Sequence, residues 1–348
     1  MNNSSVTANS IKAWFLAARP KTLTGAVAPV LVGGSMAFST GGDGIIFLFC
    51  LLFAICMQID ANFINDYFDF RKGTDREDRL GPERACAQGW ITPSAMCWGI
   101  LLTTVLSCLV GLIILILAVC DDFSTLINMA TSEPHQFDFS SVVCPITPEG
   151  FQRGIILLLV GLFCVVFSFL YTTSLSYLGL GDLLVLVFFG LIPVVFTHYV
   201  MTQGQWSYPL LTAGIAMGLV TDSLLMVNNY RDRHQDKLSG KRTIVVRIIQ
   251  LQTRRLGTEV GQQSASLISL RLYLWLGILS ALFGFVTALL LGDGHIIRGL
   301  LSMLLFMGMH FATYRKMLLL DGKALNSILG ATARNIFFFG LLLAFTVL

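Results

Sequence analysis

Two short strings in this chain contain residue types that bind metal ions and charged substrates. The first string is NDYFD at 65–69, and the second is NNYRD at 228–232, 163 residues further along. Carboxylate and amide oxygens are the ligands that hard divalent cations take from proteins. Because the strings resemble each other, we interpret them as an internal repeat that brings two acidic segments to one site.

The acids within each string recur at helical spacing. Asn62, Asp66 and Asp69 are separated by four and three residues, and Asp232 and Asp236 are four apart. On a helix each set shares one face, where like charges repel unless cations neutralise them. Mg²⁺ commonly binds one or two carboxylates together with phosphate oxygens. The spacing therefore predicts a diphosphate held between two acidic helix ends by Mg²⁺.

Basic residues follow both strings closely. The charge that grows on a leaving diphosphate is stabilised by metal ions and cationic donors. Solvated charge beside a membrane is an alternative explanation of the same pattern. The spacing does not match a calcium-binding EF-hand loop. The basic residues are Lys72, Arg79 and Arg84 after the first string, and Arg231, Arg233, Lys237, Lys241 and Arg242 within or after the second.

The composition indicates that membrane helices position these residues. Of the 348 residues, 55% are hydrophobic and 12% are charged, against about 25% charged in soluble domains. The mean hydropathy of +0.75 excludes an ordinary soluble enzyme. The net charge of +3 is small and dispersed, so no nucleic-acid partner is expected, and no feature implies a protein partner.

Nine apolar runs are long enough to span a lipid bilayer. We therefore expect an all-α integral membrane protein, a bundle of about nine transmembrane helices in a single domain over 1–348. Its two Asp-rich loops, 62–94 and 228–247, are related by the repeat. The expected spans are 23–39, 44–65, 95–119, 154–174, 181–200, 208–227, 272–291, 295–314 and 325–348.

The distribution of basic residues predicts the orientation of the chain. With the N-terminus in the cytoplasm, 21 of the 23 Lys and Arg residues fall on the cytoplasmic side, and Arg153 and Arg298 do not, as the positive-inside rule requires. The strings follow the second and sixth spans, so both loops are cytoplasmic. The loop 120–153 lies on the other side, and we assign it no chemistry.

At these residues the chain resembles the UbiA superfamily of intramembrane prenyltransferases. The segments NDYFDFRKGTDREDRLGPERACAQGWIT (65–92) and NNYRDRHQDKLSGKRTIVVR (228–247) are similar to its two Asp-rich motifs. Within the superfamily they look like the 1,4-dihydroxy-2-naphthoate polyprenyltransferase branch, with Gly73 where the hydroxybenzoate branch usually has Asp. The segments ARPKTL (18–23) and YLGLGDLLVLVFFG (177–190) resemble other recurrent parts of that branch.

The resemblance implies a reaction in the inner cell membrane. Mg²⁺ assists ionisation of an allylic polyprenyl diphosphate, and an electron-rich aromatic acid attacks the resulting carbocation. Loss of the ring's carboxylate gives demethylmenaquinol, in menaquinone biosynthesis. The partners implied are therefore a polyprenyl diphosphate, a small aromatic acid and the lipid bilayer.

The resemblance also assigns roles to residues by position. Asp66, Asp69, Asp232 and Asp236 are the expected catalytic residues, and with Asp75 they are the expected metal ligands. The expected diphosphate-binding residues are Asn62, Asn65, Lys72, Arg79, Asn229, Lys237, Lys241 and Arg242.

Five further residues are candidates for binding the aromatic substrate. Arg19 and Lys21 lie at the edge of the first span, where they would hold an acidic substrate or reach to the membrane surface. The resemblance places Tyr177 and Asp182 beside the aromatic ring. Asp222 lies seven residues before Asn229 on the same helix face, and a carboxylate at that depth is a functional candidate, with a polar contact to another helix as the alternative.

Two insertions and two other functions stay open at this point. The stretch 120–153 is longer than the family's usual connection, and 248–266 forms an added lid, entrance or linker near the expected site. Another aromatic acceptor, such as 4-hydroxybenzoate or homogentisate, is one alternative function. A cation-coupled transporter is the other, although transporter sites lie near the bilayer midplane and these acids gather at one membrane face.

Overall fold

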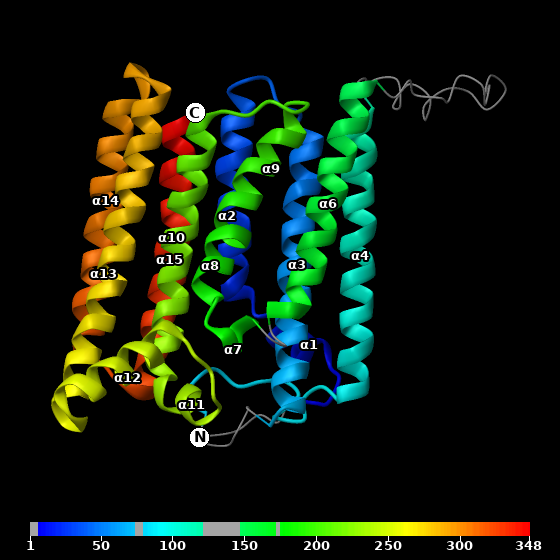
Figure 1. The fold of residues 1–348 in the computed structure, drawn as a ribbon. Coiled ribbons are helices and arrows are strands. Elements are labelled where there is room, and N and C mark those ends of the chain that lie inside the picture. Colours follow the sequence, from blue (N-terminus) through cyan, green and yellow to red (C-terminus); the bar gives the residue numbers. More distant parts are fainter. Residues whose placement is uncertain (1–5, 74–78, 121–146, 172–174) are drawn as a thin grey trace.

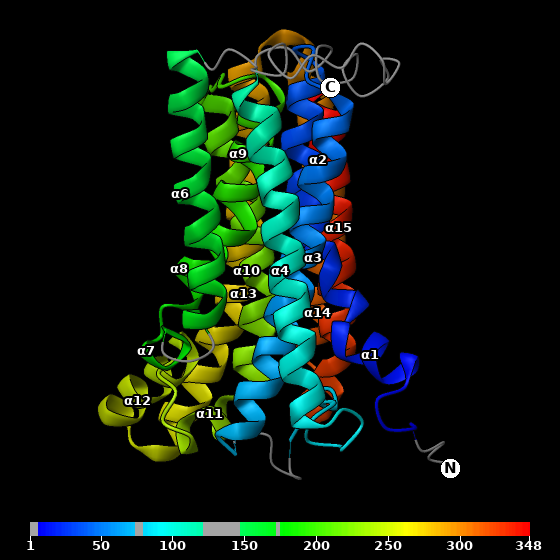
Figure 2. The ribbon, with the colours of Figure 1, turned by 90° about the vertical axis from the view of Figure 1, so that its right-hand side faces the viewer.

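The chain folds into a bundle of long helices, shown from two directions in Figures 1 and 2. This computed structural model describes residues 6–73, 79–120, 147–171 and 175–348, and every helix or strand assigned within them is a helix. In this described part of the chain, eight helices are long and apolar enough to cross a membrane, with Gly181–Met201 taken as one. The expectation of an all-helical membrane bundle is confirmed.

The long helices run roughly along one axis (Figure 1). They are α2 (Pro20–Phe38), α3 (Gly44–Arg71), α4 (Pro93–Val119), α6 (Pro148–Leu170), α10 (Tyr208–Arg231), α13 (Thr258–Leu291), α14 (Asp293–Met317) and α15 (Asn326–Val347). A further rod is interrupted and consists of α8 (Gly181–Leu186), the π-helix η4 (Val187–Leu191) and α9 (Ile192–Met201). The short elements are α1 (Ile11–Ala18), α7 (Ser176–Leu178), α11 (Arg233–Leu238), α12 (Ile244–Leu256) and the 3-10 helix η5 (Gly322–Leu325).

The first expected span, 23–39, corresponds to α2 but is not one of the eight. This 19-residue helix lies inside the bundle, where Ala28 and Val32 are fully buried. Gly340 of α15 lies so close to it that an added Cβ would be 2.7 Å from the Ala28 Cβ. Small residues permit such close helix packing in membranes. The expected count of nine spans is therefore approximate.

Capping residues set where several of the helices begin. The Asp43 side chain accepts hydrogen bonds from two backbone amides at the start of α3, including Ile45 N at 2.6 Å. Thr92 and Thr147 do the same for α4 and α6, and a proline follows each of them at the first helical position. Such caps satisfy amides that have no partner inside the helix.

The π-helix η4 and helix α10 cross with their backbones in contact. A Cβ added at Gly190 would lie 2.3 Å from the Gly214 carbonyl oxygen and 2.6 Å from the Gly218 Cα. No larger side chain fits there without moving the two helices apart. This crossing holds the α8 end of the interrupted rod, which carries Asp182, beside α10, which carries Asp222.

Asp60 is a membrane-embedded carboxyl that the sequence analysis did not single out. It lies within α3 and is fully buried. Its Oδ1 accepts hydrogen bonds from the Thr103 and Thr104 hydroxyls of α4, at 2.6 and 3.0 Å. A polar contact of this kind holds neighbouring helices together in lipid, so we assign Asp60 a structural role between α3 and α4.

The inserted stretch 248–266 is helical. Its first part completes α12, and its last part begins α13, which starts at Thr258, 14 residues before the expected span 272–291. A helix of 34 residues measures about 50 Å, whereas the hydrocarbon layer is about 30 Å thick. The first turns of α13 therefore project beyond the hydrocarbon.

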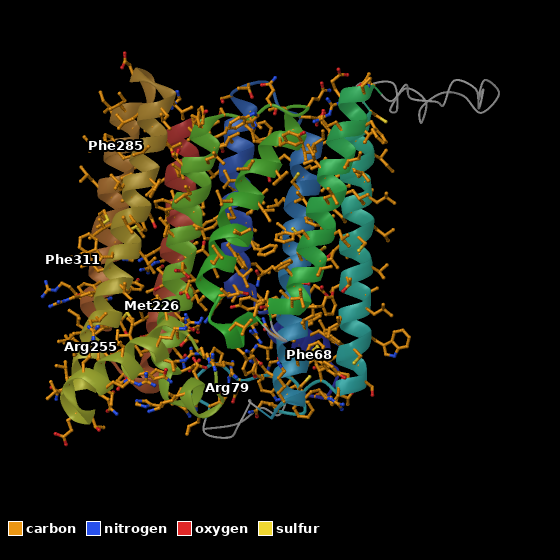
Figure 3. The ribbon with its side chains drawn as sticks, viewed as in Figure 1. Phe68, Arg79, Met226, Arg255, Phe285 and Phe311 are labelled. Carbon is orange, nitrogen blue, oxygen red and sulfur yellow. The ribbon has the colours of Figure 1, made fainter. Side chains whose placement is uncertain are left out.

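Charged side chains gather at one end of the bundle. Figure 3 shows nitrogen and oxygen atoms concentrated near Arg79 and Arg255, whereas Phe285 and Phe311 lie along the helices away from that end. Helix α3 ends here at Arg71, and α10 ends here at Arg231. We call this the motif end.

Candidate active site

A pocket with a volume of about 1040 Å³ opens at the motif end. Both Asp-rich strings contribute to its wall, as the internal repeat predicts. Most of the residues singled out from the sequence line it: Arg19, Lys21, Asn65, Asp69, Lys72, Arg79, Arg84, Tyr177, Asp182, Asn229, Arg231, Asp232, Asp236 and Lys241.

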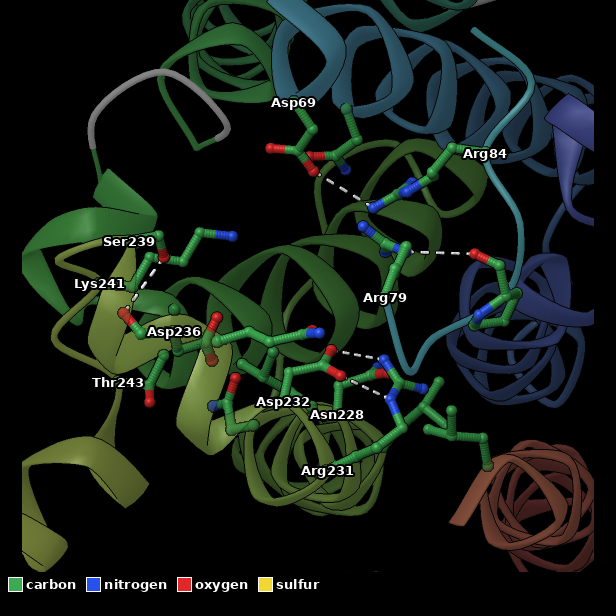
Figure 4. Close-up of a pocket in the computed structure, with 18 of the residues that line it drawn as sticks. Asp69, Arg79, Arg84, Asn228, Arg231, Asp232, Asp236, Ser239, Lys241 and Thr243 are labelled. Atoms are coloured by element: carbon green, nitrogen blue, oxygen red, sulfur yellow. Dashed lines mark hydrogen bonds and ion pairs between the residues drawn. The ribbon is translucent and has the colours of Figure 1, made fainter. Parts of the chain in front are cut away.

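The first string supplies Asp69 from the last turn of α3. This carboxyl is mostly buried, and its Oδ2 accepts a hydrogen bond from Arg84 Nη2 at 3.3 Å. Figure 4 shows Arg84 reaching Asp69 from the strand-like loop after α3, with Arg79 nearby in the pocket. The Arg79 Nε donates to the Pro82 carbonyl at 3.2 Å. The first motif thus presents an acid already paired with a cation.

Asp66 faces away from the pocket, although the sequence analysis expected it to bind metal. It is 1% exposed, and its two oxygens accept the backbone amides of Ala85 and Cys86 at 2.9 and 2.8 Å. Arg19 Nη2 lies 3.8 Å from its Oδ2. Asp66 therefore fixes the loop that carries Arg84.

Asn62 also makes structural hydrogen bonds and does not line the pocket. Its amide nitrogen donates to the Ala18 carbonyl at 2.9 Å and to the Thr22 hydroxyl at 3.0 Å. These bonds tie α3 to the elbow between α1 and α2. The structure therefore does not bring Asn62 to the position where it was expected to bind diphosphate.

The second string supplies Asp232 where α10 ends. Arg231, 2% exposed, forms a two-point ion pair with it: Nε to Oδ1 at 2.7 Å and Nη2 to Oδ2 at 2.5 Å. Both dashed contacts are visible in Figure 4. The remaining Arg231 Nη1 donates to Asn326 Oδ1 at 2.9 Å, and Asn326 Nδ2 donates to the Leu80 carbonyl at 2.9 Å. Asn326 thus links the second motif to the loop of the first.

Asp236 lies one helical turn beyond Asp232, on α11, and is 8% exposed. The pKa of its carboxyl is raised to about 6, mainly by burial; Lys241 opposes this shift, and Asp232 adds to it. A carboxyl with such a pKa is partly protonated at mildly acidic pH. A bound cation would favour its ionised form.

Two lysines border the same tyrosine ring in the pocket. Lys72 follows the first motif, and its Nζ lies 4.4 Å from the centroid of the Tyr177 ring. Lys241 follows the second motif, and its Nζ lies 5.7 Å from the same centroid. Ring faces attract cations, so Tyr177 helps hold both ammonium groups at the pocket. Lys72 and Lys241 are therefore placed where they were expected to contact a diphosphate.

Two other predicted cations do not line this pocket. Lys237 lies in a second, smaller pocket beside α11. Arg242 has an exposed side chain, and its backbone amide donates to the Tyr177 carbonyl at 3.2 Å. The structure therefore does not bring Lys237 and Arg242 to the diphosphate position expected from the sequence.

The candidates for the aromatic substrate lie on different walls. Arg19 adopts a left-handed backbone conformation (φ 50°) directly before Pro20, at the elbow that leads into α2. Such a conformation is uncommon in a residue with a side chain, and it often occurs at functional sites. Lys21 lines the pocket on the same side, whereas Tyr177 and Asp182 line it from α7 and α8.

Asp222 lies behind this second wall. It is 7% exposed, and within the described part of the chain its Oδ1 has no hydrogen-bond partner. It shares a face of α10 with Leu225 and Asn229, which line the pocket. The Asp182 carboxyl is near enough to repel it electrostatically. Both acids also interact electrostatically with Tyr171, another lining residue that the resemblance did not assign.

The donor set fits divalent metal ions. Asp69, Asp232 and Asp236 offer carboxylate oxygens, and Asn65 and Asn229 offer amide oxygens, around one pocket. No three His, Cys, Asp or Glu residues are grouped closely enough to hold a metal alone, as far as the described residues go. Mg²⁺ needs only one or two carboxylates if phosphate oxygens and waters complete its shell. Asp75, another expected ligand, lies outside the described residues.

The fold and this pocket define a multi-span membrane protein with a polar site at one end of its bundle. The model of the UbiA prenyltransferase family matches residues 26–120 and 140–318, most of the chain. The chain therefore belongs to the UbiA prenyltransferase family, as the Asp-rich segments predicted. This family is generally metal-dependent.

Two similar proteins are both named 1,4-dihydroxy-2-naphthoate octaprenyltransferase. The one from Haemophilus influenzae is 34% identical over 68% of this chain and 70% of its own length. The one from Escherichia coli is 33% identical over 78% of this chain and 82% of its own length.

A solved structure shares the fold. It comes from work on the biosynthesis of digeranylgeranylglyceryl phosphate synthase in membranes. It aligns with a TM-score of 0.52 and 16% identity, over 97% of this chain and 98% of that one.

Proposed function

We propose that this protein transfers a polyprenyl group from its diphosphate to 1,4-dihydroxy-2-naphthoate, with Mg²⁺ and with loss of the acceptor's carboxylate, giving demethylmenaquinol. The observation that carries the proposal is the meeting of Asp69 with Asp232 and Asp236 at one pocket at the motif end. The names of the two similar bacterial proteins support the choice of acceptor.

The diphosphate lies at the acidic and basic part of the pocket in this proposal. Asp69, Asp232 and Asp236, with Asn65 and Asn229, would hold Mg²⁺. Bound there, the metal would neutralise the diphosphate and stabilise the charge that develops as it leaves. Asp66 is not needed for this task, because both its oxygens are used by backbone amides.

The cations that now pair with the acids are positioned to change partner. Arg84 contacts Asp69, and Arg231 contacts Asp232. If these acids held Mg²⁺, each guanidinium could contact a phosphate oxygen, for which its planar donors are well suited. Lys72 and Lys241, held at the Tyr177 ring, supply two further positive charges.

Breaking the allylic carbon–oxygen bond leaves a diphosphate and a delocalised carbocation. The aromatic faces of Tyr171 and Tyr177 border the pocket between the two motifs and the α8 wall. Ring faces stabilise cations by about 0.5–2 kcal/mol. Burial of the reacting carbon also keeps water away from the carbocation, so that the acceptor ring attacks instead.

The acceptor lies near the other end of the pocket. Its carboxylate would face the cations Arg19 and Lys21 and not the acids Asp182 and Asp222. Its hydroxyls would face the two acids, where the Asp222 oxygen without a partner can accept a hydrogen bond. A ring that carries both a carboxylate and hydroxyl groups would therefore be oriented, because the basic wall prefers the carboxylate and the acidic wall prefers the hydroxyls.

The membrane orientation belongs to the same proposal. Eight apolar helices support a location in the membrane, and we propose the inner cell membrane with the N-terminus and the motif end in the cytoplasm. The concentration of Lys and Arg at the loops of that end supports this orientation. A midplane transporter is disfavoured, because the acids gather at one end of the bundle.

A product assay tests the proposal directly. Purified protein would receive Mg²⁺, a polyprenyl diphosphate and either 1,4-dihydroxy-2-naphthoate or 4-hydroxybenzoate, with EDTA in a parallel reaction. We expect a prenylated naphthoquinol only from the first acceptor and only with metal. If only 4-hydroxybenzoate gives product, the proposed acceptor is wrong. If product forms in the presence of EDTA, the reaction does not need the metal.

A further inference from the structure

A second cavity of about 260 Å³ lies at the motif end, outside the active-site pocket. It is enclosed by α11, α12 and the projecting first turns of α13, which Figure 1 shows side by side at the lower left. Its lining residues are Tyr230, Arg233, His234, Lys237, Val245, Ile249, Gln262, Gln263, Ser266 and Ser269. None of the roles proposed for the prenyl transfer uses this cavity.

The charged lining residues of this cavity are all basic. Arg233, His234 and Lys237 face it, and no Asp or Glu is among its described lining residues. Arg233 is fixed in place: its Nη1 donates to the Tyr230 carbonyl at 2.6 Å, its Nη2 donates to Asp321 at 3.0 Å, and its guanidinium lies 4.4 Å from the Tyr230 ring centroid. Arg233 is therefore neutralised by Asp321, and the Lys237 ammonium supplies the positive charge that no described carboxylate pairs with.

The neutral polar residues of the cavity supply further donors. Gln262 and Gln263 lie on α13 and have exposed side chains without a side-chain hydrogen bond to any described residue. The same holds for the Lys237 ammonium, which has no ion pair within the described chain. Ser266 shares a hydrogen bond of 2.6 Å with the Tyr230 hydroxyl. Basic and amide donors around a small cavity favour an anion with several acceptor oxygens, such as a phosphate group.

The depth of the cavity matches that of lipid headgroups. Val260, Leu267 and Trp275 are each more than half exposed along one face of α13, and Arg271 is exposed between the last two. Exposed Trp and Arg are typical of the membrane interface. Ser266 is five residues from Arg271, or about 7.5 Å along a helix. The cavity thus opens beside an apolar face that acyl chains can contact.

We propose that this cavity binds the phosphate group of a membrane phospholipid. The phosphate contacts Lys237, His234 and the two glutamines, and the acyl chains lie along the exposed face from Leu267 towards Trp275. This assignment accounts for the position of Lys237, which the sequence placed in the active site. A free phosphate ion offers the same oxygens, but it gains nothing from the apolar face.

The experiment compares binding of four probes to the full-length protein in detergent with EDTA, by native mass spectrometry. The probes are short-chain phosphatidylglycerol, phosphatidylcholine, diacylglycerol and inorganic phosphate. We expect one phosphatidylglycerol to bind at least fivefold more tightly than diacylglycerol. If inorganic phosphate binds as tightly as the lipid, the ligand is not a phospholipid. If diacylglycerol binds as tightly as phosphatidylglycerol, the cavity does not recognise the phosphate group.

Matched variants locate the bound lipid. The double substitution His234→Gln and Lys237→Gln should weaken phosphatidylglycerol at least fivefold. Its control is Arg254→Gln with Arg255→Gln, at two exposed basic residues of α12 that do not line the cavity. The control should change binding less than twofold. Equal losses in both double variants would show that only the general positive charge attracts the lipid, and would overturn the site.

A second pair of variants protects the test from misfolding. Gln263→Glu places a negative charge in the cavity at an exposed position, and Gln250→Glu places one on the exposed surface of α12. Neither change removes a buried contact. We expect weaker phosphatidylglycerol binding in Gln263→Glu alone, with both variants keeping the thermal unfolding midpoint of the parent. Unchanged binding in Gln263→Glu would contradict the proposal.

Discussion

Arg231 donates a hydrogen bond of 2.9 Å to Asn326, a residue 95 positions further along the chain. Asn326 in turn donates to the Leu80 carbonyl. The start of α15 therefore joins the ion pair of the second motif to the loop of the first. Since the two motifs must hold one diphosphate between them in the proposed reaction, this bridge fixes their separation.

Replacing Asn326 with Ala should weaken the use of the diphosphate substrate. Arg231 and Leu80 would each lose a partner, and leaving a polar group unpaired costs about 1–3 kcal/mol. We expect kcat/KM for the polyprenyl diphosphate to fall about tenfold. Ser327→Ala is the control, because its hydroxyl bonds only the nearby Ala324 carbonyl. Equal kinetics in the two variants would mean that the bridge does not matter.

Asp66 and Asp69 should respond differently to the same substitution. Asp69→Asn removes a carboxylate from the pocket and should lower activity about a hundredfold or more, with little change in the thermal unfolding midpoint. Asp66→Asn weakens two buried hydrogen bonds and should lower the free energy of unfolding by about 1–3 kcal/mol. The protein that stays folded should retain activity.

The measurement pairs initial rates with thermal unfolding for both variants. Rates are expressed per folded molecule, so that loss of protein is not counted as loss of catalysis. An Asp66→Asn variant that is stable and inactive would restore Asp66 as a metal ligand, as the sequence first indicated. An active Asp69→Asn variant would remove the first motif from the metal site.

Asp236 should make metal binding depend on pH. With its pKa at about 6, about one tenth of the carboxyl is ionised at pH 5 and most of it at pH 7. Since metal binds the ionised form, Mg²⁺ affinity should weaken about tenfold from pH 7 to pH 5. Calorimetric titration at several pH values measures this, and Asp236→Asn should show a flatter pH profile.

The same group makes an opposite contribution to stability without metal. Between its ordinary pKa of 3.8 and the raised value of about 6, the folded protein holds the proton more tightly than the unfolded chain does. This contribution to stability is therefore present at low pH and is lost as pH rises through that window. If the contribution of Asp236 to stability grew with pH, its pKa would not be raised in the folded protein.

Much of the fold could be predicted because its signals are local. Apolar runs of membrane length predict helices, and helical spacing predicts that Asp232 and Asp236 lie on one side. The direction of Asp66 could not be predicted in this way. That carboxyl accepts the backbone amides of Ala85 and Cys86, and helical spacing does not predict the path of the irregular loop that carries them.

The parts of the site that were missed depend on contacts between distant segments. Asn326 has no motif around it, and its role arises from the packing of α15 against the ends of α3 and α10. Lys237 directly follows Asp236 on α11. Consecutive residues of a helix point about 100° apart, so the two neighbours line different pockets.

Asp222 offers the sharpest test of how the acceptor binds. Replacing it with Asn keeps its shape but exchanges the carboxyl oxygen that has no partner among the described residues for an amide. We expect KM for 1,4-dihydroxy-2-naphthoate to rise several-fold, because the amide is a weaker acceptor for a hydroxyl. KM for the polyprenyl diphosphate should not change, since its phosphates lie at the motifs.

Asp60→Asn is the matched control for this prediction. Asp60 is also a buried carboxyl in a membrane helix, but Thr103 and Thr104 already satisfy it. Its substitution should leave both KM values unchanged in the protein that folds. If Asp222→Asn raised both KM values equally, or neither, then Asp222 would be a contact between helices, and the hydroxyl groups of the acceptor would have to be recognised elsewhere in the pocket.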